Sequence, residues 1–268
     1  MKDVRICTLY SGSGGNSTYI RVGNTEILID AGKCARALCS ALREIGSDIS
    51  RISAIFITHE HTDHVSALEV LSKKHSIPIH ITNTSAKKFD RDPEAFIHKS
   101  LVRHEEIEFS VNVDTLTVSS FHTPHDSMMS VGYRIETNRD NTPIKLAVAT
   151  DIGYVTENIY KHLLGCEAVV LESNHDIDML MRGPYPYDLK KRILSKGGHL
   201  ANKDSAALGA ELARHGTKAF LLAHLSEENN TPEIAFDEFY SAIADDAVSI
   251  SVAAADSPTE LIFKRSKS

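Results

Sequence analysis

The sequence has few cysteines and no long apolar run. Cys7, Cys34, Cys39 and Cys166 are scattered without a Cys-x-x-Cys pair, which predicts reduced, core-packed thiols rather than a disulfide framework. No stretch reaches the roughly 18 apolar residues of a membrane-spanning helix. Residues Met1 to Arg5 lead directly into a strand-like stretch, without the apolar core of a signal peptide. These absences favour a cytoplasmic protein that does not span a membrane.

An excess of positive charge is also missing. The chain carries 36 acidic and 29 basic residues, for a net charge of −7. This balance argues against broad, non-specific coating of nucleic acid, although not against a nucleic-acid substrate. Basic residues do concentrate in one stretch, at Lys190, Lys191, Arg192 and Lys196. The stretch is either a solvated helix face or a set of phosphate contacts.

Four potential metal ligands lie close together at His59, His61, Asp63 and His64. They follow the apolar run Ala54 to Ile57, which predicts a buried strand and places the cluster on the loop after it. Closely spaced imidazoles with one carboxylate suit a hydrolytic Zn²⁺ or Mn²⁺ centre. The spacing is not the helical His-Glu-x-x-His of zinc proteases, because position 63 is an aspartate. His59 and His61 can serve one ion, and Asp63 and His64 a second.

Strand-like and helix-like segments alternate in the first and last thirds of the chain, and the middle is rich in strands. Strands are predicted at 4–9, 18–22, 26–30, 54–57, 79–82, 107–113, 116–120, 131–136, 145–149, 168–171, 220–223 and 249–252. Helices are predicted at 33–45, 64–75, 186–195, 202–214 and 232–243, with another beginning near Pro93 and a hairpin turn at 138–141. The pattern indicates two sheets between outer helices, in one domain spanning 1–268.

A glycine-rich segment, 11–17, joins the first two predicted strands. It lacks the Gly-Lys-Ser/Thr ending of a P-loop and does not open a helix, so it is not a nucleotide fingerprint. We interpret it as a tight turn that needs positive φ. Its small side chains would allow it to approach a metal site closely.

A centre with two ions needs further ligands from other strand ends. His122 and His125 follow the predicted strand 116–120, while Asp151 and His224 end two later apolar strands. A carboxylate such as Asp151 can bridge two cations about 3.5–4 Å apart. Alone, Asp151 or His224 would be a structural cap. Beside the cluster at 59–64, we interpret them as ligands.

The order of these motifs resembles the metallo-β-lactamase superfamily from residue 4 to about 250, and its YycJ/WalJ-like branch in particular. The motifs that carry the resemblance are 11–17, 17–20, 28–32, 59–64, 125–127, 150–155, 171–176, 198–202 and 224–230. One departure is Ala201, where the branch pattern Gly-His-Leu-Ser-Asn has serine. This change removes a possible hydrogen bond but no metal ligand.

The resemblance implies an α/β fold (α+β in some schemes), the αββα four-layer sandwich, with two divalent ions in a cleft at one end. By analogy, one ion is held by His59, His61 and His125. The other is held by Asp63, His64 and His224, and Asp151 bridges the two. His122 is the rival of His125 for the third position. The ions would be Mn²⁺ or Zn²⁺, with Fe²⁺ as a further option.

Two such ions activate a water molecule, so hydrolysis is the expected reaction. The sequence has no Gly-x-Ser-x-Gly elbow that would supply a serine nucleophile. Asp63, Glu172, His175 and His199 are the candidate catalytic residues. The segment 198–229 is similar to a region of ribonuclease Z in which a histidine and a glutamate assist phosphodiester cleavage. Alternatively, Glu172, His175 and His199 form a buried polar network that supports the metal ligands.

The branch implies a 5′-to-3′ exonuclease that acts on DNA, with little sequence specificity and a link to mismatch repair. Aromatic residues make up 6% of the chain and tryptophan is absent, so base stacking could involve Tyr154, Tyr185 or Tyr187, although packing or loop structure is the favoured role of each. One alternative is a hydrolase of a small ester, thioester, lactam or cyclic phosphodiester. A non-enzymatic accessory protein with a structural metal site is the other.

Overall fold

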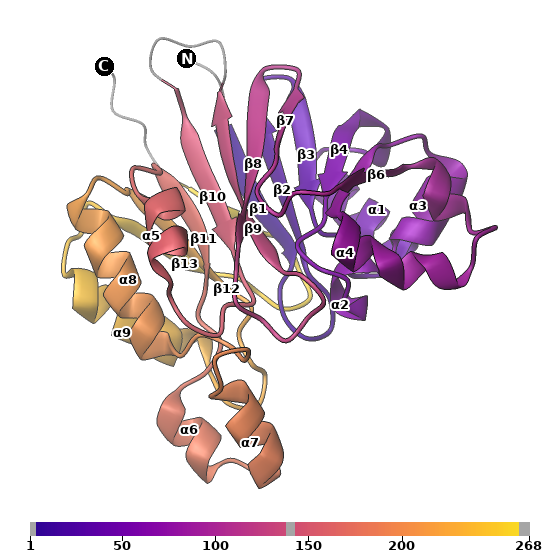
Figure 1. Cartoon of the computed structure of the whole chain (residues 1–268). Helices are drawn as coiled ribbons and strands as arrows, with labels where there is room; N and C mark the ends of the chain where they lie inside the picture. Colours follow the sequence, from indigo (N-terminus) through magenta and orange to yellow (C-terminus); the bar gives the residue numbers. More distant parts are fainter. Residues whose placement is uncertain (1–3, 138–142, 263–268) are drawn as a thin grey trace.

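The computed structural model describes residues 4–137 and 143–262, which form two facing seven-stranded sheets with helices on both outer sides (Figure 1). The first sheet contains, in spatial order, β14 (Thr259–Leu261), β1 (Val4–Tyr10), β2 (Ser17–Val22), β3 (Thr25–Ile29), β4 (Ile52–Phe56), β5 (Ile79–Thr82) and β6 (Leu101–His104). The second contains β13 (Ser249–Val252), β12 (Ala219–Ala223), β11 (Ala168–Glu172), β10 (Lys145–Ala149), β9 (Val131–Thr137), β8 (Leu116–His122) and β7 (Ser110–Val113). The αββα sandwich expected from the sequence is confirmed.

Helices cover the outer side of each sheet. On the first sheet and its edge lie α1 (Ala35–Glu44), α2 (Thr62–Val65), α3 (Leu68–Lys74), α4 (Asn83–Ala86) and the 3₁₀ turns Ile49–Arg51, Lys87–Arg91 and Phe96–Lys99. On the second lie α5 (Glu157–Leu163), α8 (Asn202–Arg214) and α9 (Pro232–Ile243). None of the described helices is long and apolar enough to cross a membrane.

The period-two alternation of the strands creates separate hydrophobic layers. In β3, Ile27 and Ile29 face the second sheet, whereas Leu28 faces the helices on the other side. Ile55 in β4 joins Leu28 in the outer layer. On the far side of the second sheet, Phe220 packs with the helices α8 and α9. Because both faces of the central strands are covered, these strands are buried almost completely.

Strand direction places the chemistry at one end of the sandwich. Strands β3 to β6 are parallel in the first sheet, as are β10 to β13 in the second. The predicted meander is also present, since β7, β8, β9 and β10 pair antiparallel in that order. Residues that follow parallel strands meet at the same sheet edge. The predicted turn at 138–141 lies outside the described residues.

Several predicted elements differ from the structure. The helix predicted at 64–75 is broken into α2 and α3, because His64 and Ala67 form backbone hydrogen bonds with Ala31 instead of continuing one helix. Pro93 precedes a 3₁₀ turn, and the strand predicted from 107 begins at Ser110. The sequence pattern did not reveal β6, β14, α4, α5 or the helix α6 (Ile177–Arg182). The thiol predictions hold for the buried Cys7 and Cys166, whereas Cys34 is exposed.

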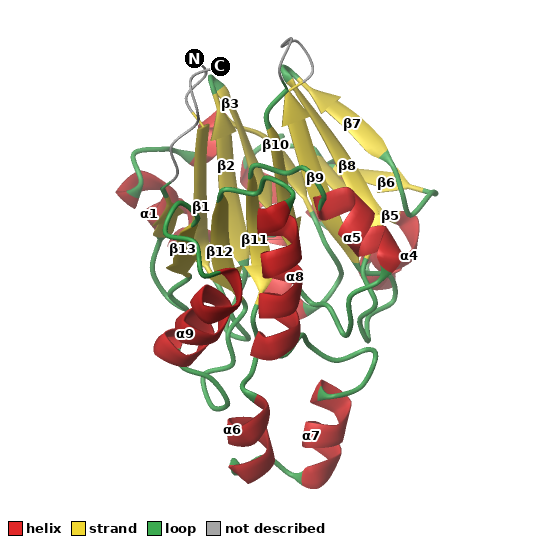
Figure 2. Cartoon of the chain, turned by 90° about the vertical axis from the view of Figure 1, so that its left-hand side faces the viewer, coloured by secondary structure: helices red, strands yellow, loops and turns green. Residues whose placement is uncertain are grey.

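Two short helices project from the end of the sandwich. Helices α6 (Ile177–Arg182) and α7 (Tyr187–Ile193) lie beyond the strand ends and apart from α8 and α9 (Figures 1 and 2). The chain that leaves α7 returns to the sandwich at His199. The backbone N–H of Asp126 donates to the Gly197 carbonyl and attaches this segment to the sandwich, while the N–H of His199 donates to the Ile193 carbonyl at the end of α7. The projection therefore borders the sheet edge where the predicted ligands gather.

Candidate metal centre

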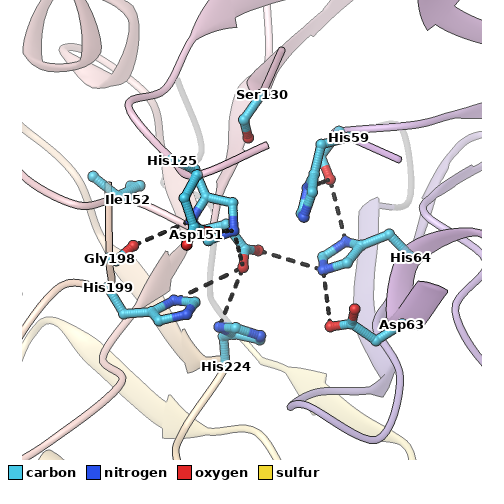
Figure 3. Close-up of polar contacts among 12 residues, drawn as sticks. His59, Asp63, His64, His125, Ser130, Asp151, Ile152, Gly198, His199 and His224 are labelled. Atoms are coloured by element: carbon cyan, nitrogen blue, oxygen red, sulfur yellow. Dashed lines mark hydrogen bonds and ion pairs between the residues drawn. The ribbon is translucent and has the colours of Figure 1, made fainter. Parts of the chain in front are cut away.

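Side chains from both sheets converge at the ends of β4, β8, β10 and β12 (Figure 3). The ring nitrogens of His59, His61 and His125 lie within 4.8 Å of one another, close enough to hold one ion. A donor atom from each of Asp63, His64 and His224 forms a second such group. The structure thus brings together the residues that the sequence analysis predicted as ligands of each of the two ions.

Asp151 lies between the two groups. Its Oδ1 is 3.8 Å from Nε2 of His125 and 3.6 Å from Nδ1 of His224, while its Oδ2 is 3.6 Å from Nε2 of His64. One carboxylate therefore faces ligands of both sets, which is the geometry of a bridging group. These spacings are wider than hydrogen bonds and leave room for cations between the partners.

Buried polar atoms without partners show that the centre fits metal ions. Among the described residues, Nε2 of His59, Nε2 of His224 and Oδ2 of Asp151 are buried and form no hydrogen bond. Leaving such atoms unpaired is costly unless something else satisfies them. Asp30, Asp151 and Glu172 are also at most 3% exposed, and buried carboxylates require positive partners. Two divalent cations would satisfy both the lone pairs and the charge.

In three of the candidate ligands, an oxygen atom holds the Nδ1 of the imidazole. His64 Nδ1 lies 2.8 Å from Oδ2 of Asp30, and His59 Nδ1 lies 3.0 Å from the Thr58 hydroxyl. His125 donates from Nδ1 to the Gly198 carbonyl at 3.1 Å. Such bonds fix the ring orientation and leave Nε2 for a metal.

Asp30 supports the candidate centre, and the sequence analysis did not assign it a role there. It follows β3 and is held by the backbone N–H and hydroxyl of Thr58, both at 2.8 Å, as well as by His64. The signal was available, because a polar residue that ends an apolar strand is the criterion that singled out Asp151 and His224. All three residues adopt positive φ, at 64°, 57° and 58°. Such backbone strain at non-glycine residues clusters at functional sites.

Glu172 has a related arrangement in the second sheet. Its Oε1 accepts hydrogen bonds from Nδ1 of His199 at 2.8 Å and from Nδ1 of His224 at 2.9 Å. Its Oε2 accepts from the backbone N–H groups of Ile152 and Leu200. The carboxylate is fully buried and its acceptor sites are occupied, so it orients the two imidazoles.

The remaining predicted histidines differ in position. His122 ends β8 with an exposed side chain, whereas its rival His125 lies among the donor groups. His175 is 1% exposed, and neither of its ring nitrogens has a hydrogen-bond partner among the described residues. It does pair through the backbone with Ala201. His199 has a partly exposed side chain at the edge of the centre.

The surroundings shift the pKa values of the ligands in two directions. Burial lowers the pKa of His59 well below its usual value, and it also lowers that of His61. Burial opposes protonation of His224 as well, but Asp151 and Glu172 outweigh it and raise this pKa to about 9. Metals bind neutral imidazole. His59 and His61 are therefore in the neutral form that a metal ion would need, while His224 would have to lose a proton to act as a ligand.

The predicted glycine-rich turn approaches the centre. Gly12 and Gly15 have φ of 145° and 149°, as a tight turn with positive φ requires. Asn16 donates from Nδ2 to Oδ2 of Asp63 at 3.2 Å. The hydroxyl of Ser11 accepts from the backbone N–H of His224 at 2.7 Å. The turn therefore links ligands that come from the two sheets.

These features define a class of protein. A family model described as the beta-lactamase superfamily domain matches residues 25–225. The chain belongs to the metallo-β-lactamase superfamily, and it is a metal-dependent hydrolase with candidate His and Asp ligands for divalent ions.

Curated relatives place the chain more closely. It is 35% identical over 231 residues to exodeoxyribonuclease YycJ of Bacillus anthracis, covering 85% of this chain and 84% of that protein. It is 32% identical over 228 residues to exodeoxyribonuclease WalJ of Streptococcus pneumoniae, covering 85% and 83%. Among solved structures, the metallo-β-lactamase fold protein YhfI from Bacillus subtilis matches with a TM-score of 0.69 and 16% identity, over 96% of this chain and 100% of that one. The last match shows the shared fold.

Proposed function

We propose that this protein is a dinuclear-metal-dependent phosphodiesterase, a 5′-to-3′ DNA exonuclease with little sequence specificity that serves DNA repair. The observation that carries the proposal is the similarity, over 85% of the chain, to two relatives named exodeoxyribonucleases. The site agrees with this activity, because a metal centre flanked by a protonatable histidine suits phosphodiester hydrolysis. Strand polarity and the repair role follow from the resemblance to the YycJ/WalJ-like branch.

The proposed ligand assignment follows the two donor groups. His59, His61 and His125 would hold one ion, Asp63, His64 and His224 the other, and Asp151 would bridge them. Three imidazoles with carboxylates suit Mn²⁺ or Zn²⁺, and also Fe²⁺. When bound, the ions would polarise the phosphodiester and the attacking water.

His199 is the proposed catalytic histidine. Its Nδ1 is engaged by Glu172, so Nε2 is the atom that can bind a phosphate oxygen or give a proton to the leaving oxygen. Glu172 acts through His199 and His224 and does not touch the substrate. His175 is too deeply buried to reach a substrate, and we infer that it supports the loop of His199 through its backbone pairing with Ala201.

Positive side chains near the centre provide a path for the substrate backbone. Lys88, Arg91 and Arg192 line an open cleft together with His61 and Asp63. Arg192 is held by an ion pair with Asp126, whereas Arg91 is exposed. Contacts of this kind bind phosphates without reading sequence. In the predicted basic stretch, Lys190 instead donates to the carbonyls of Met181 and Gly183 and fixes the turn between α6 and α7.

The proposal is tested with end-labelled duplexes, single strands and metal analysis. Protein loaded with Mn²⁺, Zn²⁺ or Fe²⁺ should release mononucleotides from 5′ ends, and the Asp151→Asn variant should not, because it loses the bridging charge. A parallel panel of chromogenic esters, thioesters, lactams and cyclic phosphodiesters tests the alternative hydrolase. Faster turnover of a non-nucleic substrate, with no metal-dependent release of nucleotides, would reject the nuclease assignment.

A further inference from the structure

A small pocket adjoins the metal centre on the side of the projecting helices. His199 and His224 line it at the metal side, and Tyr185, Leu189, Ile193 and Leu225 give it an apolar wall. Polar side chains complete the lining, at Ser13, Asp126, Asn174, Arg192 and Ser226. The pocket has a volume of about 180 Å³, below the roughly 300–1,000 Å³ of pockets for drug-sized ligands. The pocket therefore suits one small ring system placed directly beside the reacting bond.

Most of the apolar wall lies outside the hydrophobic clusters of the sandwich. Leu189 and Ile193 are four residues apart and share one face of α7, yet no residue of α7 is buried. Across the described residues, the three hydrophobic clusters contain neither of them, nor Tyr185. By contrast, Leu225 packs partly against the cluster under α8 and α9. An apolar helix face that is half-buried and outside every cluster is available to an apolar ligand.

The positive charge of the cleft on the other side of the metal centre indicates what kind of ligand the pocket would take. The open cleft across the metal centre is lined by Lys88 and Arg91, and Arg192 lines both this cleft and the pocket. A molecule that fits both flanks has anionic groups on one side of the cleaved bond and a flat apolar face on the other. A nucleotide within a strand has this combination, since its phosphates are charged and every base has an apolar π-face.

We propose that the pocket bounded by Tyr185, Leu189 and Ile193 holds the base of the terminal nucleotide while its phosphodiester lies over the metal centre. This inference rests on the proposed nuclease function and names a subsite of it. The contacts are made with the faces of the base, so they distinguish a base from no base but hardly one base from another. The pocket would therefore accept any base, but it would favour a terminal nucleotide that carries a base over one that has lost it.

The test compares duplexes that end in a normal nucleotide with duplexes that end in an abasic one. Wild-type protein should cleave the normal end with a kcat/KM about five- to a hundredfold higher, the range expected for one stacked base. Tyr185→Ala and Ile193→Ala should lose most of this difference by a rise in KM on the normal end, with little change on the abasic end. Tyr185→Phe keeps the ring and should retain the preference.

Tyr187→Ala is the matched control, because Tyr187 begins α7, is 75% exposed and does not line the pocket, so the structure removes it from the candidate stacking residues. It should behave as wild type, and metal content and thermal unfolding should be equal in all variants that are compared. If wild type cleaves both ends equally, or if the pocket variants slow both ends alike, the base pocket is wrong and the nuclease assignment stands. If neither end is cleaved with any metal, the nuclease assignment itself fails.

Discussion

The two sheets support their metal ligands with buried carboxylates in different ways. In the first sheet, Asp30 holds one ligand, His64, and its other contacts are to Thr58. In the second sheet, Glu172 holds the proposed ligand His224 and also His199, which lines the pocket beside the candidate centre. Under the proposed function, the first arrangement would support metal binding alone, whereas the second would join metal binding to proton transfer through one carboxylate. Substitutions on the two sides should therefore produce different defects.

The largest expected effect is a loss of kcat in a variant of His199, a residue that is not among the proposed metal ligands. His199→Ala should lower kcat on duplex DNA by about 10²–10⁴-fold, the range for loss of a general acid or base. Both ions should remain bound, because the variant keeps every proposed ligand. Metal analysis beside single-turnover kinetics measures the two properties. A variant that loses an ion, or that keeps its kcat, would contradict the role given to His199.

Conservative substitutions of Asp30 and Glu172 test directly whether the two buried carboxylates have different roles. Asp30→Asn and Glu172→Gln should each weaken metal affinity by roughly 10–100-fold, as substitution of an outer partner does. At saturating metal, only Glu172→Gln should also change the pH profile of kcat, because only Glu172 contacts His199. Asp178→Asn and Glu157→Gln are matched controls on exposed sites. Identical pH profiles for both buried variants would remove the proposed difference between the sheets.

The sequence was sufficient to predict the fold and the candidate ligands that the structure brings together, but not the residues that hold those candidates in place. The cluster from His59 to His64 is local, and Asp151 and His224 each end an apolar strand, so pattern and spacing reveal them. Asp30 contacts His64 from 34 residues away, and no local pattern shows which distant histidine a carboxylate will meet. The break between α2 and α3 has the same origin, because it depends on backbone bonds to Ala31.

A pH effect on stability is expected in the first sheet, away from the metal centre. His80 in β5 stacks on Phe56, with 4.8 Å between the ring centroids, and its Nδ1 lies 3.0 Å from Nε2 of His104. Burial, with a smaller effect of His104, lowers its pKa from 6.5 to about 4. The unfolded chain therefore binds a proton that the folded protein does not between these values, and stability falls as the pH drops from 6.5 towards 4.

The expected slope from His80 is about 1.4 kcal/mol per pH unit in that interval. His80→Phe keeps a stacked ring without the titration, so its unfolding free energy should depend less steeply on pH. Urea unfolding of both proteins at several pH values, with the metal state held the same, isolates the difference. Parallel curves for the two proteins would mean that His80 does not contribute.

The smallest expected effect is on the stability of α8, which covers the second sheet. Ala201 is its N-cap residue and provides no side-chain hydrogen bond, whereas serine is among the preferred residues there. Ala201→Ser should raise the free energy of unfolding by about 1 kcal/mol. Ala201→Cys, similar in size but a weak acceptor, should not. Chemical denaturation measures both, and an equal gain from serine and cysteine would indicate better packing rather than capping.

The pairing of β14 with β1 has a consequence for synthesis. Arg5 and Glu260 form an ion pair across these strands although they are 255 positions apart. A nascent chain therefore exposes the unpaired edge of β1 until its residues 259–261 leave the ribosome. Such an edge can pair with other chains, so slow translation near the end should favour aggregation more than a pause earlier in the message.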